Sequence, residues 1–501
     1  MLALFCNLSR SFLPDSQGGQ GGSGNDVEGI AEIFCDSDSR PEGAQEGKTG
    51  GFNIEDGTRS FLRLLRCLST TASRPIGDYM AFATLSERNI RTAANGTSDG
   101  AKGNLCRTWT APMILAFLFL LALCFQDSSP FGIETGTVKP YHLMMFVVLI
   151  YSLFTLKMKW MLPGKWFFIG LLALLIISFF DYLAYGLNAA SWHYVFMYMI
   201  ATCFYNLGRD FTVAQWKRVA QTVAIVMMGL VFLKLGFYHD RITYFLANQY
   251  MGHPWLPTFF LGGVNIESSW LAMFCVFFDC NRRGKAYFFS AIALSMIYAS
   301  RASLIICVLA FVYIFVFKNG KRGVSLRLFL AVACIVCAFI ALAANGNIVI
   351  ERLLEAGQDD GSLGRLRMWD YAIPTFLDAP LFGAGAGNAI NHVSLISGLA
   401  YAEDNVHMYF LQVLLDFGIV GFFIFIAMVC SFLNRCFLDK LGSPFEAFIL
   451  IFLIVSFIQF GGGDVLVGFA LGGLFALWQY GEREAVCSIE ITNNQSMEAA
   501  A

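Results

Sequence analysis

Long apolar stretches, separated by short polar connections, constrain this chain more than any other feature of its sequence. From Ala111 onward, about twelve stretches approach the roughly twenty residues that a membrane-spanning helix needs. They cover residues 111–126, 141–156, 166–183, 191–207, 219–238, 258–279, 285–300, 301–317, 326–344, 409–433, 444–460 and 464–480. We therefore predict an all-α polytopic membrane protein with about twelve transmembrane helices.

The composition supports this class and excludes others. Of the 501 residues, 57% are hydrophobic and 14% are charged, and the mean hydropathy is +0.60, which is far from the balance of a soluble globular chain. The formal net charge is only -2, so the chain lacks the basic excess with which nucleic-acid-binding proteins neutralise phosphates. Most of the 14 cysteines lie in apolar runs, where thiols behave as small hydrophobic groups.

Lysine and arginine residues are unevenly distributed between the connections. If the N-terminus is cytoplasmic, the connections on the same side carry Lys157, Lys159, Lys165, Arg209, Lys217, Arg218, Arg282, Arg283, Lys285, Lys318, Lys321, Arg322, Arg327, Arg435 and Lys440. The connections on the other side carry only Lys139, Arg241, Arg301, Arg352, Arg365 and Arg367. Because lysine and arginine concentrate in cytoplasmic loops, this asymmetry predicts that both termini are cytoplasmic.

The chain divides into three parts. Residues 1–107 are rich in Gly, Ser and Asn and show no sustained apolar period, so they cannot bury enough surface to offset the entropy of ordering. This part is either a disordered cytoplasmic extension or a translation that begins too early, with Met80 as a later start. Residues 108–480 form the predicted membrane domain, and residues 481–501 form a cytoplasmic tail.

The connection over residues 345–408 is the only long loop on the outer side. It contains enough apolar side chains to fold back onto the membrane domain, and loops of this length are usually functional or disordered. Within it, Arg365–Phe376 predicts a short amphipathic helix, with Ser362 as its N-cap and Pro374 disturbing its last turn.

A glycine cluster follows this helix at Gly383, Gly385 and Gly387. It is not a dinucleotide fingerprint, because no strand precedes it and no acidic ribose partner follows at the required distance. We favour a tight turn that returns the loop toward the bilayer over a close approach of the backbone to a ligand.

Two positively chargeable residues border the apolar stretches. His407 precedes the stretch that begins at residue 409, where a histidine is either an interfacial or capping residue or a catalytic base. Arg301 lies between two apolar runs, and an arginine near membrane depth is costly unless an anionic group accompanies it. That group is either a carboxylate such as Glu267 or Asp464, or an anionic substrate, and the sequence leaves both open.

Three separated motifs resemble those of the O-antigen ligase and polymerase superfamily. "YASRASLIICVLAFVYIFV" is similar to a span of that family that begins with Ser-Arg. "GSLGRLRMWDYAIPTFLDAPLFGAGAGNA" resembles the beginning of its large outer loop, and "NVHMYFLQVLLDFGIVGF" resembles the end of that loop. The resemblance covers about residues 260–425, and the three motifs follow one another in the same order as in the family.

The resemblance implies a membrane glycosyltransferase that uses a lipid-linked donor, without a nucleotide sugar, a metal or another cofactor. Such enzymes transfer a glycan from undecaprenyl diphosphate to a hydroxyl of a lipid A core or of another lipid-linked glycan. They act at the periplasmic face of the bacterial inner membrane. The resemblance does not distinguish a ligase from a polymerase, and it leaves the oligomeric state open.

Carried over by position, the family's site residues are Arg301, Arg365 and His407. Arg367 stands where the family often has a different polar residue. The family usually has Asn directly after the histidine, whereas here Asn405 precedes it.

These residues suit the implied chemistry. Guanidinium groups bind phosphates in a bidentate manner, so Arg301 and Arg365 would stabilise a diphosphate leaving group. Imidazole has an unperturbed pKa of about 6.5, so His407 would serve as the base for the acceptor hydroxyl, and direct displacement would invert the anomeric carbon. Further candidates for substrate contact are Arg367, Trp369, Glu403, Asp404, Asn405 and Glu267. For Glu403 and Asp404, ordinary solvated loop carboxylates are the favoured interpretation.

Two other classes remain open. Twelve spans with buried charge are also compatible with a secondary transporter or flippase, although two similar six-span halves are not visible in the sequence. A structural or assembly role without chemistry is the third alternative.

Overall fold

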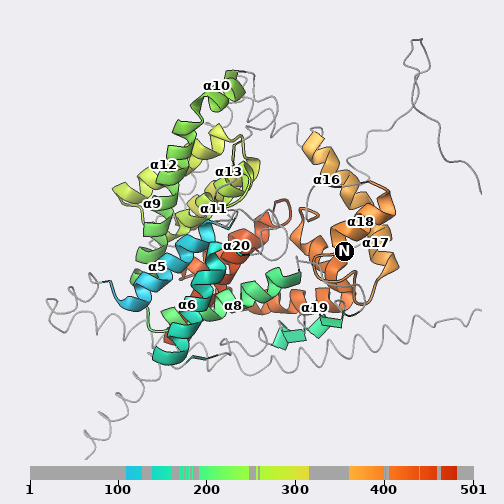
Figure 1. Ribbon diagram of the computed structural model, residues 1–501, viewed down its shortest axis with the longest axis horizontal. Coiled ribbons are helices and arrows are strands. Elements are labelled where there is room, and N and C mark those ends of the chain that lie inside the picture. The colour runs from blue at the N-terminus through green and yellow to red at the C-terminus, as the bar shows by residue number, and fades with distance from the viewer. Residues whose placement is uncertain are drawn as a thin grey trace, which may run out of the picture. The chain divides into compact units, whose positions relative to one another are not determined.

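The computed structural model describes residues 109–126, 138–156, 158–159, 169–170, 172–173, 176–177, 179–180, 183, 191–247, 256–257, 260–314, 360–399, 401, 405–438, 441–459 and 464–481. Within these ranges every regular element is a helix, which confirms the all-α prediction for this part of the chain (Figure 1). These residues belong to one compact unit, Ser86–Ala501. The predicted extension 1–107, the stretch 326–344, most of 166–183 and the tail after residue 481 lie outside the described residues.

The helices follow the predicted apolar stretches closely. The first group contains α5 (Ala111–Cys124), α6 (Pro140–Thr155), α8 (Ser191–Gly208), α9 (Val213–Phe237) and α10 (His239–Ala247). The second contains α11 (Val264–Met273), the 3-10 helix η1 (Phe274–Phe277), α12 (Arg282–Ile297) and α13 (Arg301–Val312). The third contains α16 (Asp360–Asp370), α17 (Ala372–Asp378), α18 (Ala389–Ser397), α19 (Tyr409–Leu438), α20 (Pro444–Val455) and a last helix, Val465–Gly481.

Two helix boundaries differ from prediction. α9 begins at Val213 and not near residue 219, because Thr212 and Gln215 form a capping box that starts the helix earlier. The predicted helix over Arg365–Phe376 starts at Asp360, so Ser362 lies inside α16 and is not its N-cap. The predicted helix is also divided at Tyr371 into α16 and α17, and Pro374 falls in the first turn of α17, where its missing N–H has no partner inside that helix to lose.

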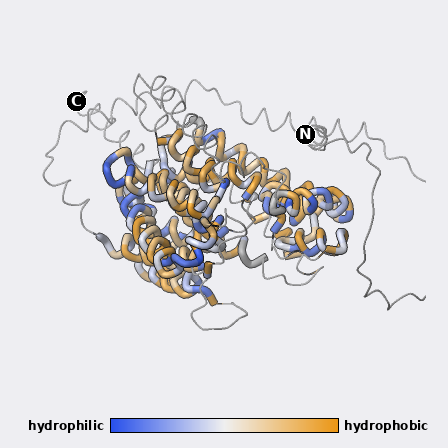
Figure 2. Tube along the Cα trace, turned by 90° about the horizontal axis from the view of Figure 1, so that it is seen from above, coloured by the Kyte–Doolittle hydropathy of each residue, from blue (hydrophilic) through white to orange (hydrophobic). Residues whose placement is uncertain are grey.

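The helices are strongly apolar, as the prevailing orange in Figure 2 shows. Two of the described helices, Val213–Phe237 and Tyr409–Cys436, are long and apolar enough to cross a membrane, and shorter apolar helices accompany them. The count of twelve spans stays a prediction.

Aromatic side chains fill the interior of the helix bundle. Trp216 of α9 is fully buried, and its ring centroid lies 6.4 Å from Phe204, 5.2 Å from Phe445 and 6.1 Å from Phe469. These four rings come from α8, α9, α20 and the last helix, so they join two parts of the chain that are far apart in the sequence. Aromatic contacts of this kind contribute about 0.5–1.5 kcal/mol per pair beyond the area that they bury.

The last helix approaches α8 through two glycines. A Cβ atom added at Gly468 would lie 2.7 Å from the carbonyl oxygen of Met197, and one added at Gly472 would lie 2.4 Å from that of Ala201. Gly468 and Gly472 are four residues apart and share one helix face, which is the arrangement that lets two helix backbones pack closely in a membrane.

The two ends of the bundle differ in charge. At one end, Lys217 at the start of α9 forms an ion pair of 3.1 Å with Asp279, just before α12. The ring of Phe277 lies 5.1 Å from that of Phe445 near the start of α20, so α20 also begins at this end. We call it the basic end, because it carries the basic connections around α9 and α12.

The opposite end brings together helix termini from separate parts of the chain. Trp270 in α11 stacks on Phe452 near the end of α20, with 6.1 Å between ring centroids. The backbone N–H of Tyr409, the first residue of α19, donates to the carbonyl of Ser456, which follows α20 (2.8 Å). We call this end, where α19 begins and α20 ends, the site end.

The glycine contact between α8 and the last helix yields a stability prediction. Gly472→Ala forces a methyl group against the backbone of α8, so we expect the thermal unfolding midpoint of the detergent-solubilised protein to fall by an amount equivalent to about 1–3 kcal/mol. The matched control is Gly229→Ala in α9, where an added Cβ meets no atom within 4 Å. Equal midpoints for the two variants would contradict the close contact.

Candidate active site

His407 is held in an uncommon backbone conformation just before α19. Its φ is +54°, in the left-handed region that non-glycine residues rarely adopt. Its N–H donates to Oδ1 of Asn405 (2.9 Å), and the N–H of Val406 donates to Oε1 of Gln412 (3.0 Å). Asn405, which precedes the histidine here, therefore fixes the turn that presents His407.

The next hydrogen bond attaches this turn to α16. The indole N–H of Trp369 donates to the carbonyl of Val406 (2.8 Å), one residue before His407. Met368 and Ala372 on the same side of α16 and α17 pack in a small core with Val406 and Leu415. Trp369, which was predicted to contact substrate, thus has an observed role in docking α16 beside the histidine.

Arg365 lies one helical turn before Trp369 and on the same face of α16. Its Nη1 donates to the carbonyl of Ile458, in the turn after α20 (2.9 Å). Because Ser456 in that turn also binds the N–H of Tyr409, Arg365 and His407 are attached to the same group of segments at the site end. Arg367, two residues farther along the helix, is exposed and points away from this face.

Arg301 is the first residue of α13 and lies at the site end as well. Its helix is capped by Ser300, and the hydroxyl of Ser303 donates to the carbonyl of Ser268 in α11 (3.0 Å). Since Trp270 in the same helix stacks on the end of α20, the start of α13 lies at the end of the bundle where α19 begins. The side chain of Arg301 is half-buried.

Glu267 is completely buried beneath the site end, in the first turn of α11. Nζ of Lys234 in α9 lies 2.7 and 2.8 Å from its two carboxylate oxygens, and the hydroxyl of Tyr298 donates to one of them at 2.8 Å. The sequence left Glu267 open between a carboxylate partner of Arg301 and a contact with substrate. In the structure its carboxylate is instead paired with Lys234. Glu403 and Asp404 lie outside the described residues.

The glycine cluster docks onto a break in α19. We call residues Pro380–Gly387 the glycine strap. Gly418 interrupts α19 with φ 62° and ψ -167°, so the helical hydrogen bonds around it are not made. The strap supplies the missing partners: Ala384 N–H donates to the carbonyl of Leu415 (2.8 Å), and Ile419 N–H donates to the carbonyl of Pro380 (2.9 Å).

This backbone pairing explains why glycine is needed on both sides. Gly383 has φ +81°, and a Cβ there would lie 2.5 Å from the backbone of Asp416, while a Cβ on Gly418 would lie 2.4 Å from that of Leu381. The predicted tight turn agrees with the structure. The close backbone approach is to another part of the chain.

Asp416 connects the strap to the turn that carries His407. Its carboxylate is buried and accepts hydrogen bonds from the N–H of Ala389 (3.1 Å), Nε2 of Gln412 (3.0 Å) and the hydroxyl of Tyr194 in α8 (3.3 Å). Gln412 in turn accepts from Val406. Asp416 and Lys234 were both missed in the sequence analysis, although an ionisable residue inside an apolar span is a functional candidate by default.

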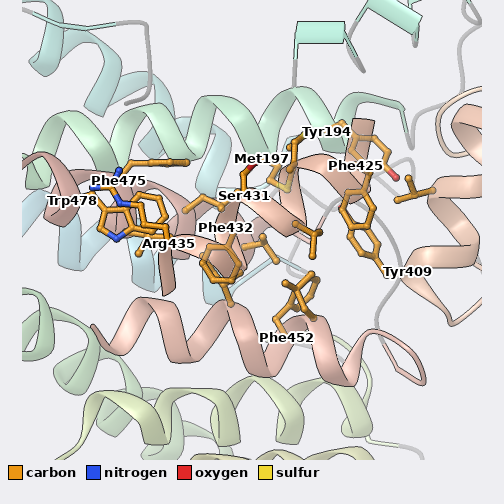
Figure 3. Close-up of a pocket in the computed structure, with 18 of the residues that line it drawn as sticks. Tyr194, Met197, Tyr409, Phe425, Ser431, Phe432, Arg435, Phe452, Phe475 and Trp478 are labelled. Atoms are coloured by element: carbon orange, nitrogen blue, oxygen red, sulfur yellow. The ribbon is translucent and has the colours of Figure 1, made fainter. Parts of the chain in front are cut away.

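An apolar cavity of about 240 Å³ runs along α19, between α8, α20 and the last helix (Figure 3). Tyr194 and Tyr409, the second residue after His407, line one end, and Arg435 and Trp478 line the other (Figure 3). The guanidinium of Arg435 lies 4.2 Å from the ring centroid of Trp478. Among the described residues, no group of three or more His, Cys, Asp or Glu side chains is arranged to hold a metal ion.

Residues 286–426 match the family model described as O-antigen ligase. The match includes α13, the α16–α18 segment and the start of α19, and therefore Arg301, Arg365 and His407. Lys234 and Glu267 precede it. A comparison of the chain with curated proteins found no significant match.

The buried carboxylate of Asp416 yields a second stability prediction. Asp416→Ala leaves the N–H of Ala389 and the hydroxyl of Tyr194 without their acceptor, and each such loss costs about 1–3 kcal/mol. We expect a clear fall in the thermal unfolding midpoint, whereas Asp378→Ala, at an exposed position of α17, should leave it unchanged. A wild-type midpoint for Asp416→Ala would mean that this network does not hold the strap.

Proposed function

We propose that this chain is a member of the O-antigen ligase and polymerase superfamily, whose O-antigen ligase model matches residues 286–426, and that it transfers a glycan from a polyprenyl-diphosphate carrier to a hydroxyl acceptor. The matched domain indicates an O-antigen ligase- or polymerase-type membrane enzyme of polysaccharide biosynthesis. The donor that we propose is an undecaprenyl-diphosphate-linked glycan, and the acceptor is a lipid A core or another lipid-linked glycan.

The observation that carries the proposal is that Arg365 and the turn of His407 are both attached to the segments that meet at the site end. α16 is fixed beside the histidine by the bond from Trp369 to Val406, and Arg365 reaches the turn after α20. A cationic fork and an imidazole are thereby placed at the same end of an apolar bundle. That pair is what displacement of a diphosphate by a hydroxyl requires.

In the proposed reaction, the acceptor oxygen attacks the anomeric carbon of the donor sugar, and the bond from that carbon to the diphosphate breaks. His407 accepts the proton of the acceptor hydroxyl. Arg365 and Arg301 stabilise the negative charge on the leaving polyprenyl diphosphate. Because attack and departure occur on opposite faces, the anomeric configuration inverts, and neither a metal nor another cofactor is part of this scheme.

The apolar cavity supports a lipid-linked donor. Its lining is almost entirely apolar, and Tyr409, which lines one end, is the second residue after His407 in the sequence. We place the first part of the polyprenyl chain there, so that the diphosphate lies at the site end and the chain extends along α19 toward Arg435. The proposed sidedness is a site that faces the periplasm in a bacterial inner membrane, with cytoplasmic termini.

The proposal predicts which substitutions remove transfer. Arg365→Ala and His407→Ala should each lower transfer from a synthetic polyprenyl-diphosphate-linked glycan by at least about a hundredfold, without reducing the amount of protein in the membrane fraction. Arg241→Ala and His239→Ala are matched controls, because both residues are exposed on α10. Transfer at the wild-type rate in either site variant would remove that residue from the site.

A vesicle assay tests the transporter alternative. Movement of glycan across the vesicle membrane without formation of a new glycosidic bond would favour a transporter.

A deletion strain distinguishes the two acceptors. Surface glycan that carries a single repeat would identify a lost polymerase, and long chains that remain on the carrier would identify a lost ligase. Surface glycan with unchanged mass and gel banding would contradict both forms of the proposal.

A further inference from the structure

The Lys234–Glu267 pair is an unusual feature for the interior of an apolar bundle. The side chains of Lys234 and Glu267 are 4% and 0% exposed, and they are 33 residues apart in the sequence. Removing two charges from water costs several kcal/mol per ion, and replacement of a buried pair by apolar residues of similar volume is often neutral or stabilising. Stability alone therefore does not account for this pair.

A third group connects the pair to the start of α13. The hydroxyl of Tyr298 donates to Oε1 of Glu267 at 2.8 Å, and Tyr298 is itself 1% exposed. Tyr298 is the C-cap of α12, Ser300 is the N-cap of α13, and Arg301 comes next. The carboxylate thus holds the short turn that ends directly at Arg301.

This turn needs external support. Ala299 has φ +49°, and a non-glycine residue in that region is unfavourable. On one side the turn is attached to α11 through Tyr298 and Glu267. On the other, the hydroxyl of Ser303 donates to the carbonyl of Ser268, also in α11. Two bonds to one neighbouring helix fix both the position and the direction of the first turn of α13.

We propose that Lys234, Glu267 and Tyr298 are positioning residues for Arg301. Lys234 compensates the charge of Glu267, and the ionised carboxylate accepts a charge-assisted hydrogen bond from Tyr298, which is stronger than a neutral one. The turn is then held so that the guanidinium of Arg301 meets the donor diphosphate. This inference rests on the proposed function, in which Arg301 stabilises the leaving group.

A pair of tyrosine variants tests the proposal. Tyr298→Phe removes only the hydroxyl that binds Glu267. Tyr287→Phe is its matched control, because the hydroxyl of Tyr287 in the same helix α12 donates to the carbonyl of Leu271 in α11, also at 2.8 Å. We expect Tyr298→Phe to lower kcat/KM for transfer about tenfold, as a small misplacement of a reacting group does, and Tyr287→Phe to change it less than about twofold. Equal effects of the two variants would overturn the proposal.

A double-mutant cycle shows whether Tyr298 acts through Arg301. Arg301→Lys removes the bidentate fork, and we expect about a hundredfold lower transfer that is still measurable. In the Arg301→Lys background, Tyr298→Phe should lower transfer by less than a further factor of about two, because the guanidinium that Tyr298 positions is already lost. The same tenfold loss in both backgrounds would overturn the inference and leave the proposed function intact. Wild-type transfer by Arg301→Lys would instead show that the proposed function is wrong for Arg301, and the inference would fall with it.

A variant without the ion pair separates positioning from folding. Lys234→Met combined with Glu267→Leu and Tyr298→Phe replaces all three polar groups by apolar side chains and leaves no buried hydroxyl without its acceptor, so we expect an unfolding midpoint close to that of the wild type. Transfer should nevertheless fall about tenfold, as with Tyr298→Phe alone, because the turn has lost its attachment to Glu267. Wild-type transfer by this triple variant would contradict the positioning role.

Discussion

The break in α19 at Gly418, and its capture by the glycine strap, is the interaction on which the arrangement of the proposed site depends. Backbone groups inside an apolar bundle must find partners within the protein, since lipid offers none. Where Gly418 interrupts the helix, the carbonyl of Leu415 and the N–H of Ile419 bind the strap and not each other. This pairing holds the α16–α18 segment against α19, and Arg365 lies on that segment.

The buried polar groups have a common function in this account. Asp416 is bonded to the start of α18, directly after the strap, to α8 through Tyr194 and, through Gln412, to the turn that presents His407. Glu267 is bonded to α9 through Lys234 and to the turn that presents Arg301 through Tyr298. In each case a buried carboxylate joins two or more helices to a turn that contains a residue with positive φ, and a proposed reacting group lies in that turn or directly after it. Networks of this kind rigidify a site when all their members are satisfied.

Much of the fold could be predicted from the sequence because membrane helices leave a strong local signal. The apolar stretches located most of the described helices, and the glycines at 383, 385 and 387 indicated a tight turn. The helix predicted over Arg365–Phe376 with Ser362 as its N-cap begins earlier, at Asp360, because a serine that can cap a helix does not show that the helix begins there. The motifs also indicated the family, which the match over residues 286–426 supports.

The partners of the buried charges could not be predicted in this way. Lys234 and Glu267 meet only because α9 and α11 pack side by side, and no periodicity reports which helices are neighbours. The sequence therefore left Glu267 open between a contact with Arg301 and a contact with substrate. Likewise, Asn405 departs from the family's order of residues, and only the structure shows that its side chain binds the N–H of His407.

The most direct test of the central claim is a cryo-electron microscopy map of the protein bound to a non-hydrolysable polyprenyl-diphosphate analogue. We predict that the diphosphate lies within hydrogen-bonding distance of Arg365 and next to His407, with the first isoprene units in the cavity along α19. Density for the diphosphate at the opposite end of that cavity, beside Arg435 and Trp478, would contradict it.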